Sequence, residues 1–479
     1  MEMTDTVLVN PLLTGEERYG VLAGGGVYMP PLGLANLAAF IRQQGYSVKI
    51  IDCCALNLSL ADSVKTILSC NPKYVGITAA TISIAKAAAL AKILKEQKPN
   101  LKIILGGCHI SALSEQTMVV FPQFDIGVIG EGELTVVELL KVLEEKDSLD
   151  NVKGIIFRED GILKINEPRP FIENLDILPF PAWDLLPDIT KFYRPSCFGF
   201  KRLPITSLLT SRGCPMRCTF CSDSPFGKTS RAHSPEYVIE MMKFLHRHYN
   251  IKDIMIYDDT FVINKQRLIR LCKLMSKERL NLIWSCNGRI ELMTREILKL
   301  MKHAGCWAIA YGIESGSQQI LDFIQKDIDL AKAYQVLKWT KEEGILTKGY
   351  FMIGNLTENK ESIRSTLNFI LNSDLDLLTL TYFTPLPGSL DYMRANQYGT
   401  FNNDWHLLSF HNIVFIPYGL NKKTMHFYRR YLVRRFYLRP KIILKFVKML
   451  FNFRSFKLIL LGFFALINFV FLDKITDSK

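Results

Sequence analysis

The 479-residue sequence lacks the features of a secreted or disulfide-stabilised protein. Its first stretch, MEMTDTVLVNPLL, has no basic region followed by an apolar run, so it predicts no signal peptide. The eleven cysteines are an odd number and, apart from one group of three, they show no regular spacing. Cys53 and Cys54 are adjacent, which is unfavourable geometry for a disulfide between them. These absences predict a cytoplasmic, reducing environment, where closely spaced cysteines more often bind metal or take part in chemistry.

Excess positive charge is nearly absent from the first 420 residues. The net charge is +13, and residues 421–479 contribute +12 of it through fourteen Lys and Arg against two Asp. A nucleic-acid-binding core is expected to carry a basic face of its own. The sequence therefore predicts no nucleic-acid partner.

The C-terminal segment also lacks an apolar run of membrane-spanning length. Residues 458–472 are fifteen residues without charge, whereas a spanning helix needs about 20. In residues 439–457 the polar side chains of Lys441, Lys445, Lys448 and Asn452 fall on one helical stripe beside apolar and aromatic residues. This pattern favours an interfacial helix that brings residues 421–472 to an anionic surface at the inner face of the membrane. A short spanning helix and a helix packed on the protein are the alternatives.

Residues 1–145 have the pattern of a doubly wound, Rossmann-like α/β domain. Apolar stretches at 6–12, 47–54, 74–80, 101–107 and 125–133 predict parallel strands, and amphipathic helices separate them. Ligands of such sheets bind at the carboxyl ends of the strands. The small and polar residues that gather there are Thr78, Gly106, Gly107, His109, Gly130, Glu131, Gly132 and Glu133.

The rest of the chain repeats the strand-and-helix theme after an ordered, extended connector at 146–203. Residues 204–400 contain six strand-like stretches, too few for an eight-fold barrel, so they predict a partial (β/α)6 barrel. A helical extension at 401–479 follows. Catalytic groups should lie at the carboxyl ends of the barrel strands, where the sequence places Cys214, Asp258, Asp259, Arg289 and Glu314.

Three cysteines, Cys214, Cys218 and Cys221, lie close together in SRGCPMRCTFC. Thiolates hold the irons of iron–sulfur clusters, and three of them leave the fourth iron of a cubane open for chemistry. Structural zinc takes four ligands, and the nearest additional one is His233. A zinc site of three cysteines and His233 is therefore the alternative.

CPMRCTFC resembles the CxxxCxxC pattern of the radical S-adenosylmethionine (SAM) enzymes. The segments IMIYDDTF, WSCNGRIE, GIESGSQQIL and FTPLPGS resemble strand-end motifs of the cobalamin-dependent branch of that superfamily. In the N-terminal domain, PPLGLANLAAFIRQQGYSVKIID, GGCH and GEGE resemble the cobalamin-binding domain of the same branch. The resemblance covers about residues 5–440 and is strongest to the group with anaerobic magnesium-protoporphyrin monomethyl ester cyclase and hopanoid-modifying enzymes.

The resemblance implies a [4Fe-4S] cluster on Cys214, Cys218 and Cys221, with SAM on the open iron. Phe220 would lie against the adenine, and Arg289 and Glu314 would hold the SAM carboxylate and ribose. Where the superfamily often has a Gly-Gly-Glu run for the SAM amino group, this chain has Tyr257, Asp258 and Asp259. The alternative for Arg289 and Glu314 is a structural ion pair in the barrel mouth, and for one Asp it is an exposed strand end.

The resemblance also implies cobalamin, although the DxHxxG run that supplies a cobalt-binding histidine is absent. His109 is the nearest candidate contact, and Gly106, Gly107, Gly130 and Gly132 would let the backbone approach the cofactor. The alternatives are a hydrogen-bonded polar residue at a strand end, turn glycines, and a domain that has lost the cofactor.

The implied activity is SAM cleavage and hydrogen abstraction from a hydrophobic or lipid-like substrate, followed by methyl transfer or by oxidation and cyclisation. A ferredoxin or flavodoxin would supply the low-potential electron. The alternative is a non-catalytic cobalamin-binding or redox-sensing protein whose cluster is structural.

Overall fold

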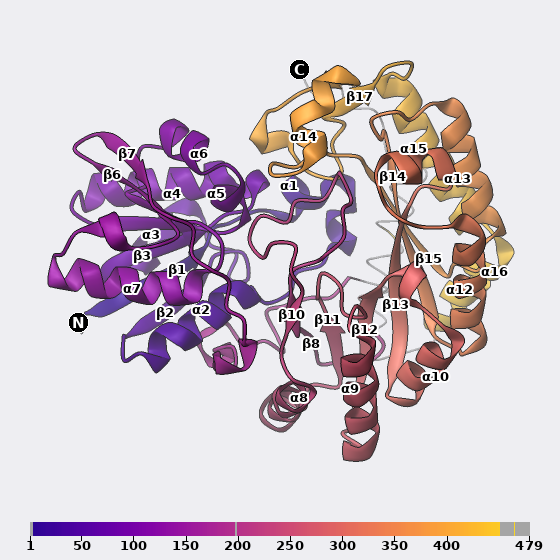
Figure 1. Ribbon diagram of the computed structural model, residues 1–479, viewed down its shortest axis with the longest axis horizontal. Coiled ribbons are helices and arrows are strands. Elements are labelled where there is room, and N and C mark those ends of the chain that lie inside the picture. Colours follow the sequence, from indigo (N-terminus) through magenta and orange to yellow (C-terminus); the bar gives the residue numbers. More distant parts are fainter. Residues whose placement is uncertain (1–2, 197–198, 451–463, 465–479) are drawn as a thin grey trace.

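The computed structural model describes residues 3–196, 199–450 and 464, and two α/β domains lie side by side in it (Figure 1). The N-terminal domain contains a seven-stranded sheet of order β2-β1-β3-β4-β5-β6-β7. Its first five strands pair in parallel, as the sequence predicts. They are β1 (Thr4–Asn10), β2 (Val48–Asp52), β3 (Pro72–Thr78), β4 (Lys102–Gly106) and β5 (Ile126–Val128).

Helices cover both faces of this sheet because successive strand residues are apolar on opposite sides. Val7 and Val9 belong to one buried cluster, whereas Leu8 between them belongs to the other. The first cluster is completed by α3 (Leu60–Ser69), α4 (Ile84–Gln97), α5 (Cys108–Ala112) and α6 (Ser114–Val120). The second is completed by α2 (Leu32–Gln43) and α7 (Gly132–Glu145).

Part of the predicted connector belongs to the first sheet. β6 (Ile155–Glu159) pairs antiparallel with β5, and β7 (Ile162–Ile165) pairs antiparallel with β6. Ile155 and Phe157 are buried in the domain core, which explains why this hairpin docks on the sheet. The extended part of the connector therefore begins only after Ile165. It packs on the N-terminal domain through Ile172, Leu175 and Leu178.

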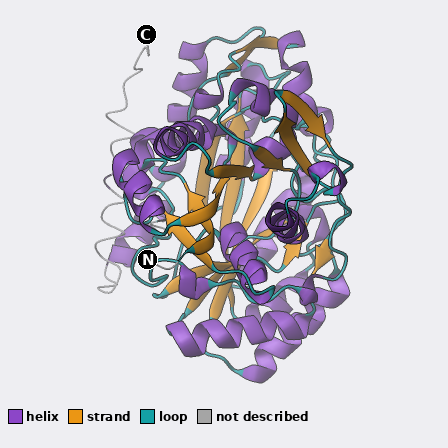
Figure 2. Ribbon diagram, turned by 90° about the vertical axis from the view of Figure 1, so that its left-hand side faces the viewer, coloured by secondary structure: helices purple, strands orange, loops and turns teal. Residues whose placement is uncertain are grey.

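The second domain is the predicted six-stranded partial barrel. Its sheet has the order β8-β11-β12-β13-β14-β15, and every neighbouring pair is parallel. The strands are β8 (Ile205–Leu208), β11 (Asp253–Ile256), β12 (Ile283–Gly288), β13 (Cys306–Glu314), β14 (Leu346–Ile353) and β15 (Leu377–Tyr382). Figure 2 shows the strands of the molecule in its interior, with helices around them. The α/β fold with a parallel half-barrel is thus confirmed.

Capping residues define where the helices outside the barrel begin. Ser234, Asn264, Thr294, Asp329 and Asn359 each accept a hydrogen bond from a backbone N–H in the first turn of the following helix. These helices are α8 (Pro235–Tyr249), α9 (Lys265–Glu278), α10 (Arg295–His303), α12 (Leu330–Glu342) and α13 (Lys360–Asn372). The short α11 (Gln318–Phe323) follows β13 directly.

The edge strand β15 is covered by α15 (Lys422–Tyr437) from the C-terminal extension. The Tyr437 hydroxyl accepts a hydrogen bond from the Leu378 N–H at 3.2 Å and donates one to the Leu378 carbonyl at 2.7 Å. Arg429 Nε donates to the Leu380 carbonyl at 3.2 Å. Side chains thus pair the backbone groups that an open sheet edge would leave exposed.

The last described helix, α16 (Pro440–Leu450), contacts the barrel. Lys445 forms an ion pair with Asp376 at 2.8 Å. This lysine of the predicted stripe therefore contacts the barrel and does not face a membrane surface. Ile443 and Leu444 are exposed instead. Within the described part of the chain no helix is long and apolar enough to cross a membrane. Most of the predicted apolar tail, 451–463 and 465–479, lies outside the described residues.

Candidate functional site

A cavity of about 170 Å³ lies at the carboxyl edge of the first sheet, where the domains meet. Its wall brings together seven of the eight residues predicted there, which are Thr78, Gly106, Gly107, Gly130, Glu131, Gly132 and Glu133. Leu209, Arg212, Pro225 and Phe226 of the second domain close the opposite side. The cavity is therefore shared between the domains.

Glycine has different structural consequences at two positions of this wall. Gly107 has φ +101°, and a Cβ there would stand 2.7 Å from the Ala79 carbonyl oxygen, so its backbone position requires glycine. A Cβ on Gly106 would meet no atom within 4 Å. Gly106 thus leaves room that a ligand could occupy, whereas Gly107 is explained by the turn alone.

His109 lies apart from this cavity wall in the described structure. Its Nδ1 is 3.1 Å from the Thr81 hydroxyl, and its ring meets Trp405 edge-on at 4.6 Å. Burial lowers the pKa of His109 to about 4, so the ring is neutral near pH 7. The Nε2 atom is buried and has no hydrogen-bond partner among the described residues. Contact with a cofactor stays a prediction for His109.

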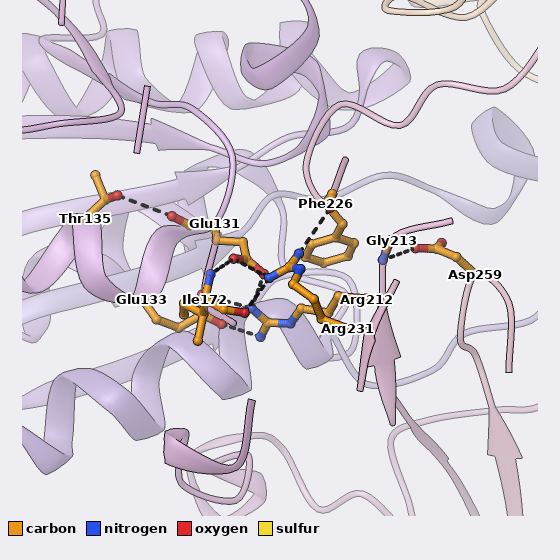
Figure 3. A network of polar contacts seen from close by, with 9 residues as sticks. All are labelled: Glu131, Glu133, Thr135, Ile172, Arg212, Gly213, Phe226, Arg231 and Asp259. Atoms are coloured by element: carbon orange, nitrogen blue, oxygen red, sulfur yellow. Dashed lines mark hydrogen bonds and ion pairs between the residues drawn. The ribbon is translucent and has the colours of Figure 1, made fainter. Parts of the chain in front are cut away.

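Glu131 and Glu133 form a buried ionic network with two arginines of the second domain (Figure 3). Arg212 donates to Glu131 at 2.9 Å and to Glu133 at 2.6 Å. Arg231 donates to both Glu131 oxygens at 2.9 Å. The four side chains are only 4 to 7% exposed. These carboxylates therefore join the two domains, a role that sequence reasoning did not identify.

Arg212 leads directly into the cysteine loop, which follows β9 (Ser211–Arg212) and precedes β10 (Arg231–Ala232). Gly213 has φ +82°, and a Cβ there would stand 2.3 Å from the Thr229 carbonyl oxygen. Its N–H donates to Asp259 at 3.1 Å. The sharp turn before Cys214 therefore depends on glycine and on the Asp259 carboxylate.

Each cysteine of the loop has a different environment. The Thr260 hydroxyl donates to Cys214 Sγ at 2.9 Å, and Arg289 NH1 lies 3.9 Å from Cys218 Sγ. The Cys221 N–H donates to the Cys218 carbonyl at 3.2 Å, so these two cysteines lie in one tight turn of the loop. Such an arrangement fits a cubane, because each thiolate binds its own iron.

The zinc alternative places His233 beside the three cysteines. Among the described residues, no group of three or more His, Cys, Asp or Glu side chains, the cysteines included, could hold a metal ion. His233, which the zinc alternative needs, has its Nδ1 3.1 Å from Asp176 and its ring stacked on Tyr237 at 4.4 Å.

Asp258 and Asp259 differ in role although they are adjacent. Asp258 is buried and accepts hydrogen bonds from Thr210 N–H at 2.5 Å, the Thr210 hydroxyl at 2.5 Å and the Ser211 hydroxyl at 2.7 Å. It anchors the backbone that leads into the cysteine loop. Asp259 and Tyr257 are exposed, so cofactor contact stays a prediction for them.

Arg289, Glu314 and Phe220 are linked through Lys326, which the sequence analysis did not identify. Lys326 Nζ lies 3.1 Å from Glu314 Oε1 and 5.6 Å from the centre of the Phe220 ring. Its carbonyl accepts from Arg289 NH2 at 3.1 Å, and Arg289 also pairs with Glu291. The predicted residues thus gather beside the cysteine loop, with Glu314 and Arg289 each in an ion pair.

The backbone at Glu314 is unusual for a non-glycine residue. Its φ is +70°, at an irregularity in the pairing of β13 with β14. Strained conformations of this kind cluster at functional sites.

A second cavity, of about 660 Å³, opens between the barrel interior and the N-terminal domain. Phe220, Cys221 and Glu314 form its cysteine-loop end, and Tyr19, Gly26 and Val27 contribute from the N-terminal domain. Most of the remaining wall is aliphatic or aromatic. The cavity is large enough for a drug-sized molecule.

Comparison with known proteins decides the family. The family model described as Radical SAM superfamily matches residues 208–370, and that described as B12 binding domain matches residues 20–140. The uncharacterized methyltransferase PH0819 of Pyrococcus horikoshii is 36% identical over 423 residues, which cover 88% of this chain and 90% of that protein. The chain belongs to the B12-binding radical SAM superfamily.

Two further relatives agree with this assignment. The anaerobic magnesium-protoporphyrin IX monomethyl ester cyclase of Rubrivivax gelatinosus is 28% identical over 367 residues, covering 75% of this chain and 65% of the cyclase. OxsB, a cobalamin-dependent SAM radical enzyme solved with aqua-cobalamin and SAM bound, shares the fold with a TM-score of 0.74. It is 19% identical, and the match covers 96% of this chain and 72% of OxsB.

The predicted resemblance is therefore confirmed. This B12-binding radical SAM protein is an enzyme of the cobalamin-dependent class, and its cofactor set is a [4Fe-4S] cluster, SAM and cobalamin. The sensor alternative is not supported.

Proposed function

We propose that this radical SAM enzyme transfers a methyl group to a hydrophobic small molecule bound in the 660 Å³ cavity. One observation carries the proposal. The same apolar cavity is lined by Cys221 of the cluster loop, by barrel strands and by the N-terminal domain. A substrate there would contact residues of both cofactor-binding domains at once.

The residues of the chain have separate tasks in this proposal. Cys214, Cys218 and Cys221 would hold three irons, and Thr260 would orient Cys214 through its 2.9 Å hydrogen bond. Phe220, Arg289, Glu314 and Lys326 would surround SAM at the cysteine-loop end. Thr78, Gly106 and Gly130 would approach one part of cobalamin, such as its nucleotide tail, because the 170 Å³ cavity is too small for the whole cofactor. Tyr257 and Asp259 would face SAM.

When bound, the cluster and SAM supply a deoxyadenosyl radical that removes hydrogen from the substrate, and methylcobalamin supplies the methyl group. A low-potential ferredoxin or flavodoxin would provide the electron. The cavity itself would exclude water from the reacting carbon, because its wall is mainly apolar.

The test uses anaerobically prepared, reconstituted enzyme with SAM, cobalamin and a strong reductant. We expect deoxyadenosine in the wild type and none in Cys218→Ala, because two thiolates do not hold the cluster with its open iron. Cys70→Ala is the matched control, since Cys70 is a partly exposed thiol at the C-cap of α3. Cobalamin-dependent S-adenosylhomocysteine supports methyl transfer, whereas deoxyadenosine without S-adenosylhomocysteine favours the oxidation or cyclisation alternative. Deoxyadenosine that persists in Cys218→Ala contradicts the proposed cluster.

We also propose that the enzyme is cytoplasmic and contacts the inner membrane surface through its C-terminal segment. Phe427 and Tyr431 stack at 5.7 Å on α15, and both are exposed. Ile443 and Leu444 are exposed on α16. Exposed apolar side chains in the most basic part of the chain suit an anionic lipid surface.

A further inference from the structure

The inner face of the barrel carries one lysine in the middle of a strand. Lys348 of β14 pairs in register with Ala310 of β13 and Leu377 of β15. Two residues later Tyr350 occupies the same face, and Lys348 Nζ lies 4.7 Å from the centre of its ring. Phe351 between them contacts Phe369 of α13. Lys348 and Tyr350 therefore face the 660 Å³ cavity, which both residues line.

Small residues of the neighbouring strand lie beside these two side chains. Ala310 and Gly312 are the β13 residues in register with Lys348 and Tyr350. A Cβ on Gly312 would stand 2.5 Å from Glu314 Oε1, so the Glu314 carboxylate occupies the space there. The rest of the cavity wall includes apolar residues such as Leu22, Val27, Met352 and Phe383.

Unlike the other charged residues of the wall, Lys348 has neither an ion pair nor a hydrogen bond to its side chain in the described structure. Glu314 is paired with Lys326 at 3.1 Å. Arg429 donates to the Leu380 carbonyl and lies 3.1 Å from His411 Nδ1. An ammonium that is partly removed from water without an anion is costly, and this cost is offset when a ligand supplies the anion.

We propose that the substrate is an elongated apolar molecule with an acidic group, such as a carboxylate, and that Lys348 binds this group. This inference deepens the proposed function and rests on it. Met352, four residues after Lys348 on the same face, packs in the cluster that Phe220 of the cysteine loop contacts. At about 3.3 Å per residue, Lys348 lies about 13 Å along the strand from Met352, at the cysteine-loop end of the cavity. The acidic group and the reacting carbon are therefore on the order of 10 Å apart.

The test measures binding of decanoate and of its neutral counterpart decanamide to the anaerobic holoenzyme by calorimetry. We expect the wild type to bind decanoate more tightly than decanamide. Lys348→Met keeps an unbranched side chain and removes the charge, so it should weaken decanoate binding about tenfold and leave decanamide binding unchanged. Lys348→Arg should retain most of the decanoate affinity.

Lys338→Met is the matched control, because Lys338 is an exposed lysine on α12. It should bind both probes as the wild type does. Lys348→Gln, which stays polar, repeats the comparison if Lys348→Met does not fold. An equal loss for both probes, an unchanged affinity for decanoate, or no binding of decanoate to the wild type would overturn the proposal.

Failure of this inference is distinguishable from failure of the proposed function. Deoxyadenosine formation is measured in the same wild-type preparation. If deoxyadenosine forms but the charge of Lys348 has no effect on decanoate, only the acidic-substrate inference is wrong. If the charge effect is present and deoxyadenosine is never formed, the anion site stands and the proposed function is wrong.

Discussion

At the scale of single residues, Glu358 shows how burial changes the behaviour of a carboxyl group. Its side chain is 1% exposed and accepts hydrogen bonds only from the N–H groups of Gly354 and Asn355. The Oε1 atom has no partner among the described residues. Burial raises the pKa of Glu358 from 4.5 to about 7. Because the folded pKa is the higher one, this group favours folding below pH 4.5, and the contribution is lost as pH rises through 7.

Glu358→Gln should therefore stabilise the protein above pH 7 and have little effect near pH 4.5. We expect the free energy of unfolding at pH 8 to rise by about 1 to 3 kcal/mol, because glutamine needs no proton to remain neutral. Denaturant unfolding at pH 5 and pH 8 measures this difference. Glu173→Gln, which changes an exposed carboxylate, is the control and should show no such pH dependence. An equal effect of Glu358→Gln at both pH values would contradict the interpretation.

At the scale of elements, the ionic network joins the start of α7 to β9 and β10. Glu131 is the residue before α7, Glu133 is in its first turn, and the arginines end β9 and begin β10. Carboxylates are favoured at this position by the helix dipole, and the buried arginines complete their pairing. The contact holds the cobalamin-binding domain next to the residue that precedes the cysteine loop.

Arg212→Met should destabilise the protein by about 3 kcal/mol or more, because Glu133 would be left buried without its cation. Arg212→Lys should lower the free energy of unfolding by a smaller, still measurable amount. Lysine keeps the charge but cannot donate to two carboxylates through one planar group. Chemical unfolding, followed by a signal from each domain, measures the decrease in the free energy of unfolding. Arg270→Met removes an exposed ion pair with Glu236, so it should change stability by less than about 1 kcal/mol. Equal effects of Arg212→Met and Arg270→Met would show that the network does not stabilise the domain contact.

At the scale of the whole molecule, charge and exposed apolar surface coincide in one region. The chain outside 421–479 is close to neutral, and the exposed apolar pair Ile443 and Leu444 lies within that basic segment. Attraction to anionic lipid and burial of apolar side chains would act at the same place.

The double variant Ile443→Gln, Leu444→Gln of the full chain should bind vesicles of phosphatidylcholine and phosphatidylglycerol more weakly than the wild type. Co-sedimentation with the vesicles measures the bound fraction. Met393→Gln is the control, because Met393 is 74% exposed on α14 (Leu390–Arg394), outside the basic segment. Binding that is the same for all three proteins, or absent from the wild type, would contradict a membrane contact through α16.

The sequence by itself determined the alternation of strands and helices, the domain order and the cluster loop. These properties depend on local periodicity and short spacings, such as the three cysteines within 214–221. It also placed seven residues correctly around the 170 Å³ cavity, because the carboxyl ends of parallel strands share one edge of the sheet.

Only the tertiary structure decided which charges meet. Arg212 and Glu133 are 79 residues apart in the chain, and Arg231 and Glu131 are 100 apart, so no local pattern relates them. The same holds for Lys326, which is far in sequence from Phe220 and contacts both Glu314 and Phe220 in the folded chain. The sequence analysis did not identify Lys348, whose position towards the cavity follows from the strand register. Long-range pairing and register arise from packing, and packing depends on the whole fold.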